Sequence, residues 1–174
     1  MLSDAVSLAD TGPVAIRYPK GLARNVDEND IGSGLQARKL VDGPTKRVCV
    51  LAIGKLVGAA LQAAETLKAS NIDLTVWDVR SCSPLDPEMI ADAMQHDFVI
   101  TAEDGIRDGG IGMTIENTIN DTSRTSTGHK RPSVQVLGVP TTFVPTAKPQ
   151  VILHQMGLDS QGIISTVKDL VDSQ

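Results

Sequence analysis

The sharpest cluster of chemically active residues is Arg17-Tyr18-Pro19-Lys20-Gly21, near the amino end of the chain. An arginine at the carboxyl end of a short predicted strand, followed by proline, lysine and glycine, has the chemistry of an anion site. Its guanidinium can grip a phosphate through two parallel hydrogen bonds, and a glycine lets the backbone approach the ligand. On residue types and spacing alone, an exposed basic turn leaving a sheet is the favoured interpretation, and the anion site is the alternative.

A second candidate stretch runs from Thr101 to Gly112, where an apolar run gives way to acidic residues and glycines. Ligands of doubly wound α/β folds bind at such junctions, between the carboxyl end of a strand and the amino terminus of a helix. The glycines do not match the dinucleotide-binding pattern, no P-loop lysine follows, and Glu103 and Asp104 would repel a phosphate. We therefore expect these two carboxylates to stabilise the positive end of a helix that begins at Gly109.

A third polar group, Asp78-Val79-Arg80 and Ser83-Pro84-Leu85-Asp86, brackets a predicted loop. Arg80 is expected to pair with Asp78 or Asp86 and to hold this loop in place. Asp86, followed by Pro87, also has the chemistry of a helix cap. The expected role of this group is structural.

The histidines and cysteines predict neither a catalytic triad nor a metal site. His96, His129 and His154 are far apart in the sequence and lack the serine, aspartate or cysteine partners that such sites need. Cys49 lies inside an apolar run and is expected to be a small buried core residue. Cys82 follows another run, and two cysteines do not make a disulfide framework in a chain of 174 residues.

Strands and helices alternate from Arg47 onward, and these elements must position the groups above. Continuous apolar runs typical of strands covered on both faces alternate with segments whose apolar residues recur at helical spacing. This alternation predicts a three-layer α/β fold with a mainly parallel, doubly wound sheet. The predicted strands are 48–53, 73–79 (with Trp77 in the core), 98–101 and 133–137; helices are predicted over 55–70, after Asp86, after Gly109, over 150–156 and over 162–171 (capped by Asp159), and an exposed loop over 120–132.

The first 46 residues do not fit this alternation. Pro13–Tyr18 has the pattern of a strand, but a lone strand without a partner is not stable. Residues 1–24 are therefore expected to be the remnant of a preceding domain. Residues 25–46 are predicted to be a linker that ends in an edge strand at Gln36–Val41, and residues 47–174 a complete domain.

Composition and charge exclude several classes of function. The net charge of −5 argues against unaided binding of nucleic acid or anionic lipid, and an aromatic content of 2% leaves little material for base stacking. No apolar run approaches the roughly 18 residues that a membrane span needs. Asp4 and Asp10 stand where a secretory signal would be apolar. We therefore expect a cytoplasmic protein with no membrane or nucleic-acid partner.

Seven short motifs follow one another in order along nearly the whole chain. They are Ala15–Gly21, Leu51–Gly54, Asp78–Arg80, Ser83–Asp86, Thr101–Asp104 with Gly109–Gly112, Gly138–Pro140 with Phe143–Pro145, and Gly157–Asp159 with Gly162-Ile163. Together they resemble the C-terminal end of the 1-deoxy-D-xylulose-5-phosphate synthases, which are thiamine-diphosphate enzymes of the transketolase group. Two motifs depart from the family pattern: Ser83 replaces its usual lysine, and Glu103-Asp104-Gly105 replaces its usual Glu-Glu-Asn.

The resemblance implies part of a three-domain transferase. Such enzymes condense pyruvate with glyceraldehyde 3-phosphate, with loss of CO2, for isoprenoid, thiamine and pyridoxal biosynthesis. Their first two domains hold thiamine diphosphate and Mg²⁺, and neither the Gly-Asp-Gly…Asn motif nor a candidate for the activating glutamate lies in this chain. The resemblance therefore implies no catalytic, cofactor-binding or metal-binding residue here, and a chain that is inactive alone.

Arg17 is the one residue to which the resemblance gives a substrate role. It matches the arginine that binds the phosphate of glyceraldehyde 3-phosphate, so the resemblance favours the anion site over the basic turn. Tyr18 and Lys20 stay structural or peripheral. The resemblance also implies N-terminal and central domains in the same chain, and a homodimer partner.

Two alternative functions stay open. The first lies in the same group: the C-terminal domain of a transketolase, or of a 2-oxoacid dehydrogenase E1 β chain, which would use a lipoyl partner. Arg17 with Lys20-Gly21 favours a phosphate substrate instead. The second is a free-standing α/β binding or assembly module, against which the unpartnered strand at Val14–Tyr18 argues.

Overall fold

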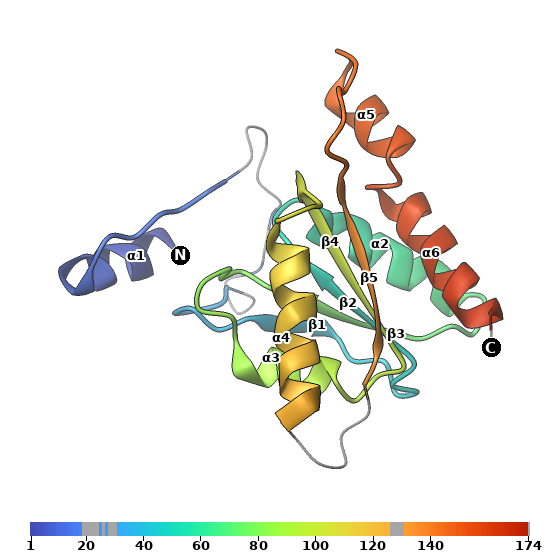
Figure 1. Ribbon diagram of the computed structural model, residues 1–174, viewed down its shortest axis with the longest axis horizontal. Coiled ribbons are helices and arrows are strands. Elements are labelled where there is room, and N and C mark those ends of the chain that lie inside the picture. Colours follow the sequence, from blue (N-terminus) through green and yellow to red (C-terminus); the bar gives the residue numbers. More distant parts are fainter. Residues whose placement is uncertain (19–24, 26, 28–30, 126–130, 174) are drawn as a thin grey trace.

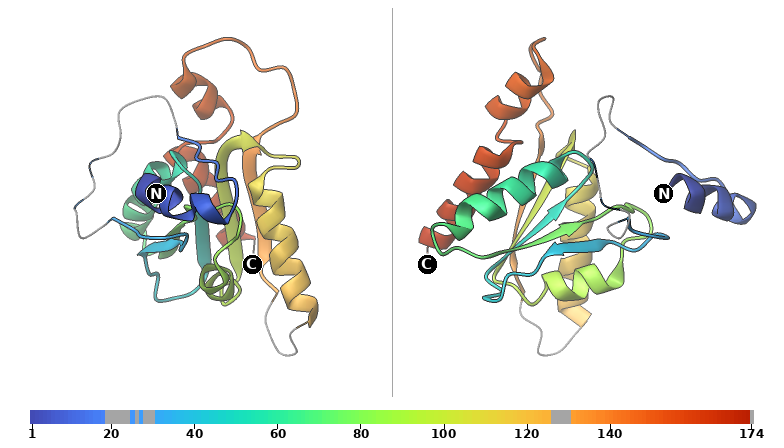
Figure 2. Two further views of the ribbon diagram at one scale, coloured as in Figure 1. Left: turned by 90° about the vertical axis from the view of Figure 1, so that its left-hand side faces the viewer. Right: turned by 180° about the vertical axis from the view of Figure 1, so that it is seen from behind.

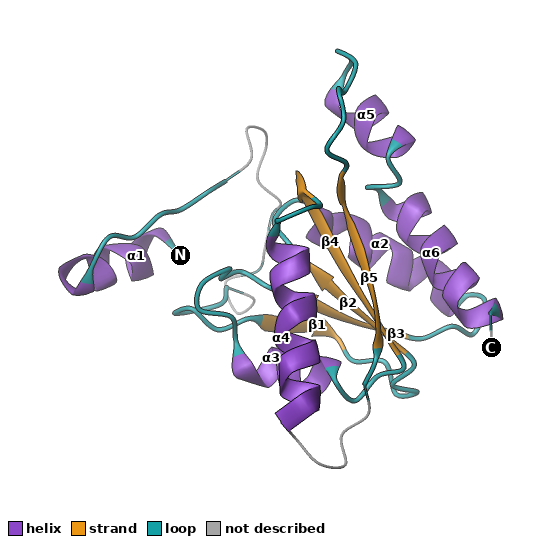
Figure 3. Ribbon diagram, in the orientation of Figure 1, coloured by secondary structure: helices purple, strands orange, loops and turns teal. Residues whose placement is uncertain are grey.

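The computed structural model describes residues 1–18, 25, 27, 31–125 and 131–173. Six α-helices, one 3-10 helix and five strands lie in these described ranges (Figures 1 and 3). In chain order they are α1 (Leu2–Leu8), η1 (Ala9–Thr11), β1 (Arg38–Val41), β2 (Val48–Ala52), α2 (Leu56–Lys68), β3 (Leu74–Asp78), α3 (Pro87–Ala93), β4 (Phe98–Ile106), α4 (Ile111–Thr125), β5 (Ser133–Val139), α5 (Pro149–Gln155) and α6 (Ser160–Asp172).

The five strands form one sheet in the order β1-β3-β2-β4-β5. β2, β3, β4 and β5 run parallel, and only the edge strand β1 is antiparallel to its neighbour β3. Val48 is in register with Leu74 on one side and Phe98 on the other, so the carboxyl ends of the parallel strands meet at one edge of the sheet. The mainly parallel sheet predicted from the sequence is confirmed.

Helices cover both faces of this sheet, which gives the three predicted layers (Figure 2). All five residues of β2 are buried, and its side chains alternate between two apolar clusters. Val48, Val50 and Ala52 pack in a cluster with buried residues of α2 and α6. Cys49 and Leu51 pack in a second cluster with residues of α3 and α4, so the prediction that Cys49 is a buried core residue is confirmed.

Two predicted helix caps are confirmed. The Asp86 carboxylate accepts hydrogen bonds from the Glu88 and Met89 amides at 2.8 and 3.4 Å, and Pro87 occupies the first position of α3. The Asp159 carboxylate accepts one from the Gly162 amide at 2.8 Å and so caps α6. No helix among the described residues is long and apolar enough to cross a bilayer.

The predicted strand at residues 13–18 is wrong. This segment is extended and mostly exposed, and no strand of the described chain pairs with it. A strand forms only where a neighbour completes its hydrogen bonds, so the local pattern was not sufficient. Residues 2–8, before this segment, form α1, which buries none of its residues and lies away from the sheet (Figures 1 and 2).

Two further boundaries differ from the prediction. α4 continues to Thr125, where a loop was expected from residue 120. The hydroxyls of Thr122, Ser123 and Thr125 donate to carbonyls four residues back, so their hydrogen bonds are satisfied within the helix. Residues 126–130 lie outside the described part of the chain. β4 continues past Thr101 to Ile106, which pairs with Val139 after an irregularity in the ladder.

Candidate functional site

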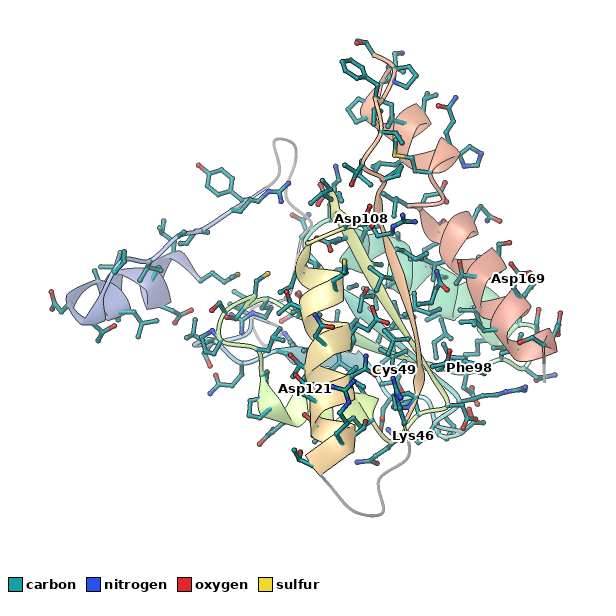
Figure 4. The ribbon with its side chains drawn as sticks, viewed as in Figure 1. Lys46, Cys49, Phe98, Asp108, Asp121 and Asp169 are labelled. Carbon is teal, nitrogen blue, oxygen red and sulfur yellow. The ribbon has the colours of Figure 1, made fainter. Side chains whose placement is uncertain are left out.

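A pocket of about 620 Å³ lies at the carboxyl edge of the sheet. The ends of β4 and β5, the segment after β5 and the extended segment before residue 19 contribute to it. Its lining residues are Arg17, Asp104, Gly105, Ile106, Val139, Pro140, Thr141, Thr142 and Phe143. This is the edge at which open α/β sheets bind ligands. In Figure 4, Asp108 marks this edge, and Lys46 and Phe98 lie toward the opposite one.

The guanidinium of Arg17 reaches this pocket from outside the sheet. Its Nη1 atom lies 3.7 Å from the point where a side chain at Gly105 would begin. Within the described part of the chain, no hydrogen bond or ion pair holds this guanidinium, and the residue is exposed. Arg17 therefore has its donors available to an anionic ligand.

The acidic groups around the pocket are engaged with other partners. Asp104 forms an ion pair with Lys55 at 2.9 Å. Asp108 accepts from Arg107 Nε and from the Thr141 hydroxyl, both at 3.0 Å, and Arg107 holds the pKa of Asp108 below its usual value. These contacts reduce the repulsion that an incoming anion would meet, and they leave Arg17 as an unpaired cation among the lining residues.

Glu103 is buried below the pocket and holds the start of α4. Its Oε1 atom accepts a hydrogen bond from the Gly112 amide at 2.9 Å, at the amino end of this helix. The prediction that Glu103 stabilises the positive helix end is confirmed. The same prediction for Asp104 is wrong, since its carboxylate turns to Lys55.

Gly105 needs to be glycine because of this arrangement. A Cβ atom at this position would lie only 2.6 Å from Oε2 of Glu103. Since the Glu103 carboxylate is fixed through its other oxygen, it has little freedom to move away. The missing side chain keeps the space between Glu103 and the Arg17 guanidinium open.

Arg80 contacts Asp78 through its backbone amide, which donates to Oδ1 of Asp78 at 3.2 Å, and its guanidinium binds other partners than the sequence suggested. Its guanidinium donates to the backbone carbonyls of Gly32 and Ser33 at 3.0 and 3.1 Å, and also to those of Gly34 and Gln36. Oδ2 of Asp86 accepts from the Ala37 amide at 2.7 Å. The sequence analysis missed these contacts because Gly32, a partner of Arg80, and Ala37, the partner of Asp86, lie more than 40 residues earlier in the chain. Arg80 and Asp86 therefore also hold the segment before β1.

The remaining candidate residues stay away from the pocket or near its border. His96 is buried, with Nδ1 2.9 Å from the Asp92 carbonyl and Nε2 2.8 Å from the Thr75 hydroxyl, and its burial lowers its pKa. His154 contacts Asp159 at 2.7 Å. Trp77 is buried as expected and donates to Asp92. His129, Lys20 and Gly21 lie outside the described residues.

Cys82 is a free, exposed thiol on the border of this region. Partial burial raises its pKa, the charge of Glu103 raises it further, and the charge of Arg17 lowers it. The pKa of the Cys82 thiol therefore depends on the charges of both Glu103 and Arg17.

No group of three or more histidine, cysteine or acidic residues that could hold a metal ion occurs in the part of the chain that the structure describes. The pocket itself offers one guanidinium and no set of carboxylates for Mg²⁺. These residues do not fit a site for Mg²⁺ and a diphosphate.

Comparison with known proteins places this fold in a family. The model of the transketolase C-terminal domain matches residues 37–163. The chain belongs to the transketolase C-terminal domain family. A solved split-gene transketolase, described as an inactive beta4 tetramer, superposes with a TM-score of 0.72 at 26% identity, over 86% of this chain and 46% of that one.

The curated relatives of this transketolase C-terminal domain confirm the resemblance carried by the seven motifs. 1-Deoxy-D-xylulose-5-phosphate synthases from Magnetococcus marinus, Burkholderia cenocepacia and Corynebacterium glutamicum are 30%, 33% and 30% identical over 98%, 94% and 99% of the chain. The chain covers only 27%, 25% and 28% of these proteins. It corresponds to the C-terminal part of such a synthase.

The structure places two residues at the pocket that the sequence analysis missed. Thr141 and Thr142 line the pocket beside Arg17, although no spacing in the sequence connects them with residue 17. The motif Gly138–Pro140 with Phe143–Pro145 was the only signal for this segment. The fold brings it to Arg17 because β5 ends next to β4 at the same edge.

Proposed function

We propose that this chain supplies the C-terminal domain and the aldehyde-phosphate site of a 1-deoxy-D-xylulose-5-phosphate synthase. The whole enzyme would condense pyruvate with glyceraldehyde 3-phosphate and release CO2. Arg17 would bind the phosphate of the aldehyde. The observation that carries this proposal is an Arg17 guanidinium without an ion-pair partner among the described residues, at a pocket whose acidic neighbours are engaged elsewhere.

The chemistry of phosphate recognition supports this role for Arg17. A planar guanidinium can offer two parallel donors to phosphate oxygens, and charge-assisted bonds of this kind are the strong ones. The hydroxyls of Thr141 and Thr142 lie in the same pocket and can contact the polar part of a small sugar phosphate. The role of these residues is to hold and orient the substrate.

Thiamine diphosphate and Mg²⁺ would be supplied by the rest of the enzyme in this proposal. When bound, the cofactor provides the carbanion chemistry of the reaction. The described residues contain no group of three or more histidine, cysteine or acidic side chains for the metal ion, which supports placing the cofactor on the rest of the enzyme. A homodimeric assembly, a cytoplasmic location and the boundary between the domain remnant, linker and C-terminal domain stay predictions.

The experiment that tests the proposal measures the binding of inorganic phosphate to this chain by calorimetry or by NMR titration. We expect Arg17→Gln to weaken binding about tenfold or more, because it removes a charge-assisted contact. Arg124→Gln is the matched control: it removes the same charge from α4, where Arg124 pairs with Asp121 on the surface. Equal affinities of wild type and Arg17→Gln would contradict the proposal.

A further inference from the structure

The segment that follows β5 is fastened to the loop that follows β4 beside the pocket. The Arg107 amide donates to the Val139 carbonyl at 2.8 Å. A Cβ atom at Gly138 would lie 2.9 Å from Cα of Arg107, so only a glycine lets the two segments come this close. Thr141 follows two residues after the end of β5 and lines the pocket. The backbone that leads to Thr141 is therefore held by two strands of the sheet.

Thr141 itself lies in the middle of a tight turn. The Thr142 amide donates to the Pro140 carbonyl at 2.8 Å, which closes a three-residue turn around Thr141. Pro140 has its φ fixed by its ring, so the turn enters from a backbone with little freedom. The turn sets the direction in which the Thr141 side chain leaves the chain.

The Thr141 hydroxyl contacts the Asp108 carboxylate, which lies at the carboxyl edge of the sheet (Figure 4). Thr141 Oγ1 is 3.0 Å from Oδ2 of Asp108, and Arg107 Nε donates to Oδ1 at 3.0 Å. The contact with Arg107 and then that with Thr141 hold the pKa of Asp108 below its usual value. Asp108 is therefore ionised at neutral pH and can only accept, so the proton in the contact with Thr141 belongs to the threonine.

The position of this proton decides what Thr141 offers to a ligand. A threonine hydroxyl has a single proton, and its remaining capacity is to accept hydrogen bonds. Because Asp108 takes the proton, Thr141 can accept from a ligand hydroxyl but cannot donate to a phosphate oxygen. Arg17, in the same lining, can only donate. The pocket therefore combines a donor group for an anion with an acceptor group for a hydroxyl.

We propose that Thr141, with its proton held by Asp108, is a specificity-determining residue that makes the pocket select phosphate esters with a hydroxyl beside the phosphorylated carbon. Such a ligand presents its anion to Arg17 and its hydroxyl proton to Thr141. Asp108 acts through Thr141 and is a positioning residue. This selectivity rests on the function proposed above and narrows it, since glyceraldehyde 3-phosphate carries such a hydroxyl.

The affinities of this chain for sn-glycerol 3-phosphate and n-propyl phosphate, measured by calorimetry, test the selectivity. The two esters share the phosphate and the carbon chain and differ in the hydroxyls. Wild type should bind glycerol 3-phosphate about three- to tenfold more tightly, as expected for one additional hydrogen bond. Thr141→Val should abolish this preference, and Thr141→Ser should keep it, because serine offers the same hydroxyl.

Thr118→Val is the matched control for the loss of the threonine hydroxyl. The Thr118 hydroxyl also donates within the chain, to the Thr114 carbonyl on α4 at 2.8 Å, but Thr118 does not belong to the pocket lining. This variant should leave the affinities for both esters and their ratio unchanged.

Asp108→Asn tests the position of the proton. Arg107 can only donate, so it orients the amide oxygen toward itself and turns the NH₂ group toward Thr141. The amide then donates to Thr141 Oγ1, and the Thr141 proton is released to the pocket. The preference for glycerol 3-phosphate should disappear, while n-propyl phosphate should bind about two- to fivefold more tightly. In a Thr141→Val background the same substitution should leave the ratio unchanged, because the lost charge acts on both esters alike.

The outcomes separate this selectivity from the proposed function. Equal binding of both esters by wild type, or a preference that persists in Thr141→Val or in Asp108→Asn, would overturn the selectivity. Arg17→Gln should weaken both esters about tenfold and leave their ratio unchanged. If Arg17→Gln changes neither affinity, the proposed function fails, and the ratio in Thr141→Val still decides the role of Thr141. Absence of binding of both esters would contradict both.

Discussion

The central residue of the proposed site is an arginine whose availability depends on the pairing of its neighbours. Asp104 lies beside Arg17 in the pocket but pairs with Lys55, which comes from the segment between β2 and α2. Glu103 is buried and engaged with Gly112. The sequence predicted that Glu103 and Asp104 would repel a phosphate, because it could not show that these carboxylates have partners from other elements.

Sequence reasoning at the scale of single residues succeeded where the chemistry was local. The caps formed by Asp86 and Asp159 depend on amides two or three residues away, and both were predicted. The contacts of Arg80 and the pocket residues Thr141 and Thr142 depend on the sheet order and on long sequence separations, so they could not be read from spacing. The substrate role of Arg17 came from the resemblance and not from its local pattern.

Cys82 provides a test of the pocket at this scale. The charge of Arg17 lowers the pKa of this thiol against the larger effects of burial and of Glu103. A phosphate bound to Arg17 would offset that positive charge, so we expect the pKa to rise and the thiolate fraction to fall. Alkylation of Cys82 by iodoacetamide near pH 8 should slow about two- to threefold with saturating phosphate.

Arg17→Gln serves as the control for the thiol measurement. This variant should react more slowly than wild type without phosphate and should not respond when phosphate is added. The alkylation rate of Cys82 measured against pH separates two effects of bound phosphate. If the charge of the phosphate raises the pKa of the thiol, the curve moves to higher pH. If the phosphate only blocks access to the thiol, the plateau of the curve falls. An unshifted curve in wild type would count against phosphate binding near Arg17.

At the scale of elements, the parallel core was predictable and the conformation of residues 13–18 was not. The strands of the core are buried on both faces and their apolar runs are unmistakable, as the five buried residues of β2 illustrate. Residues 13–18 have a strand-like pattern, but no strand of the described chain pairs with them. α4 extends through residues 120–125, which were expected to begin a loop. For residues 13–18 the missing neighbouring strand decided against the local preference, whereas the polar residues at the end of α4 bond to carbonyls of the same helix.

Asp86 joins two elements, and its substitution tests how strongly the segment before β1 is held. One carboxylate oxygen caps α3, and the other accepts from the Ala37 amide. Asp86→Ala should lower the free energy of unfolding by about 2 to 3 kcal/mol, since it removes a cap and leaves a partly buried amide without its partner. Urea unfolding measures this change.

Asp86→Asn separates the two roles of this side chain. Its amide oxygen can still cap α3, but its NH₂ group cannot accept from Ala37. We expect a loss about half as large as that of the alanine variant. An alanine variant within about 0.5 kcal/mol of wild type would show that neither contact contributes as the structure indicates.

At the scale of the whole molecule, the chain spans about a quarter of the synthases it resembles. Its described residues form a five-stranded sheet with helices on both faces, and an N-terminal segment brings Arg17 to the pocket at the edge of this sheet. The proposal gives this part the recognition of the aldehyde phosphate and gives the carbanion chemistry to the rest of the enzyme.

This division predicts that the chain alone does not turn over pyruvate. With thiamine diphosphate, Mg²⁺, pyruvate and glyceraldehyde 3-phosphate present, CO2 release should stay at the level of a control without protein. The physical reason is that the described residues contain no group of three or more histidine, cysteine or acidic side chains that could hold the Mg²⁺ needed with the cofactor. Saturable CO2 release by this polypeptide would contradict the division of roles.

The measurement that tests the central claim most directly is a calorimetric titration of this chain with glyceraldehyde 3-phosphate and, separately, with glyceraldehyde. The account predicts saturable binding of the phosphorylated aldehyde, at least about tenfold weaker binding of glyceraldehyde, and loss of this discrimination in Arg17→Gln. Equal binding of both aldehydes by wild type, or full discrimination by Arg17→Gln, would contradict it.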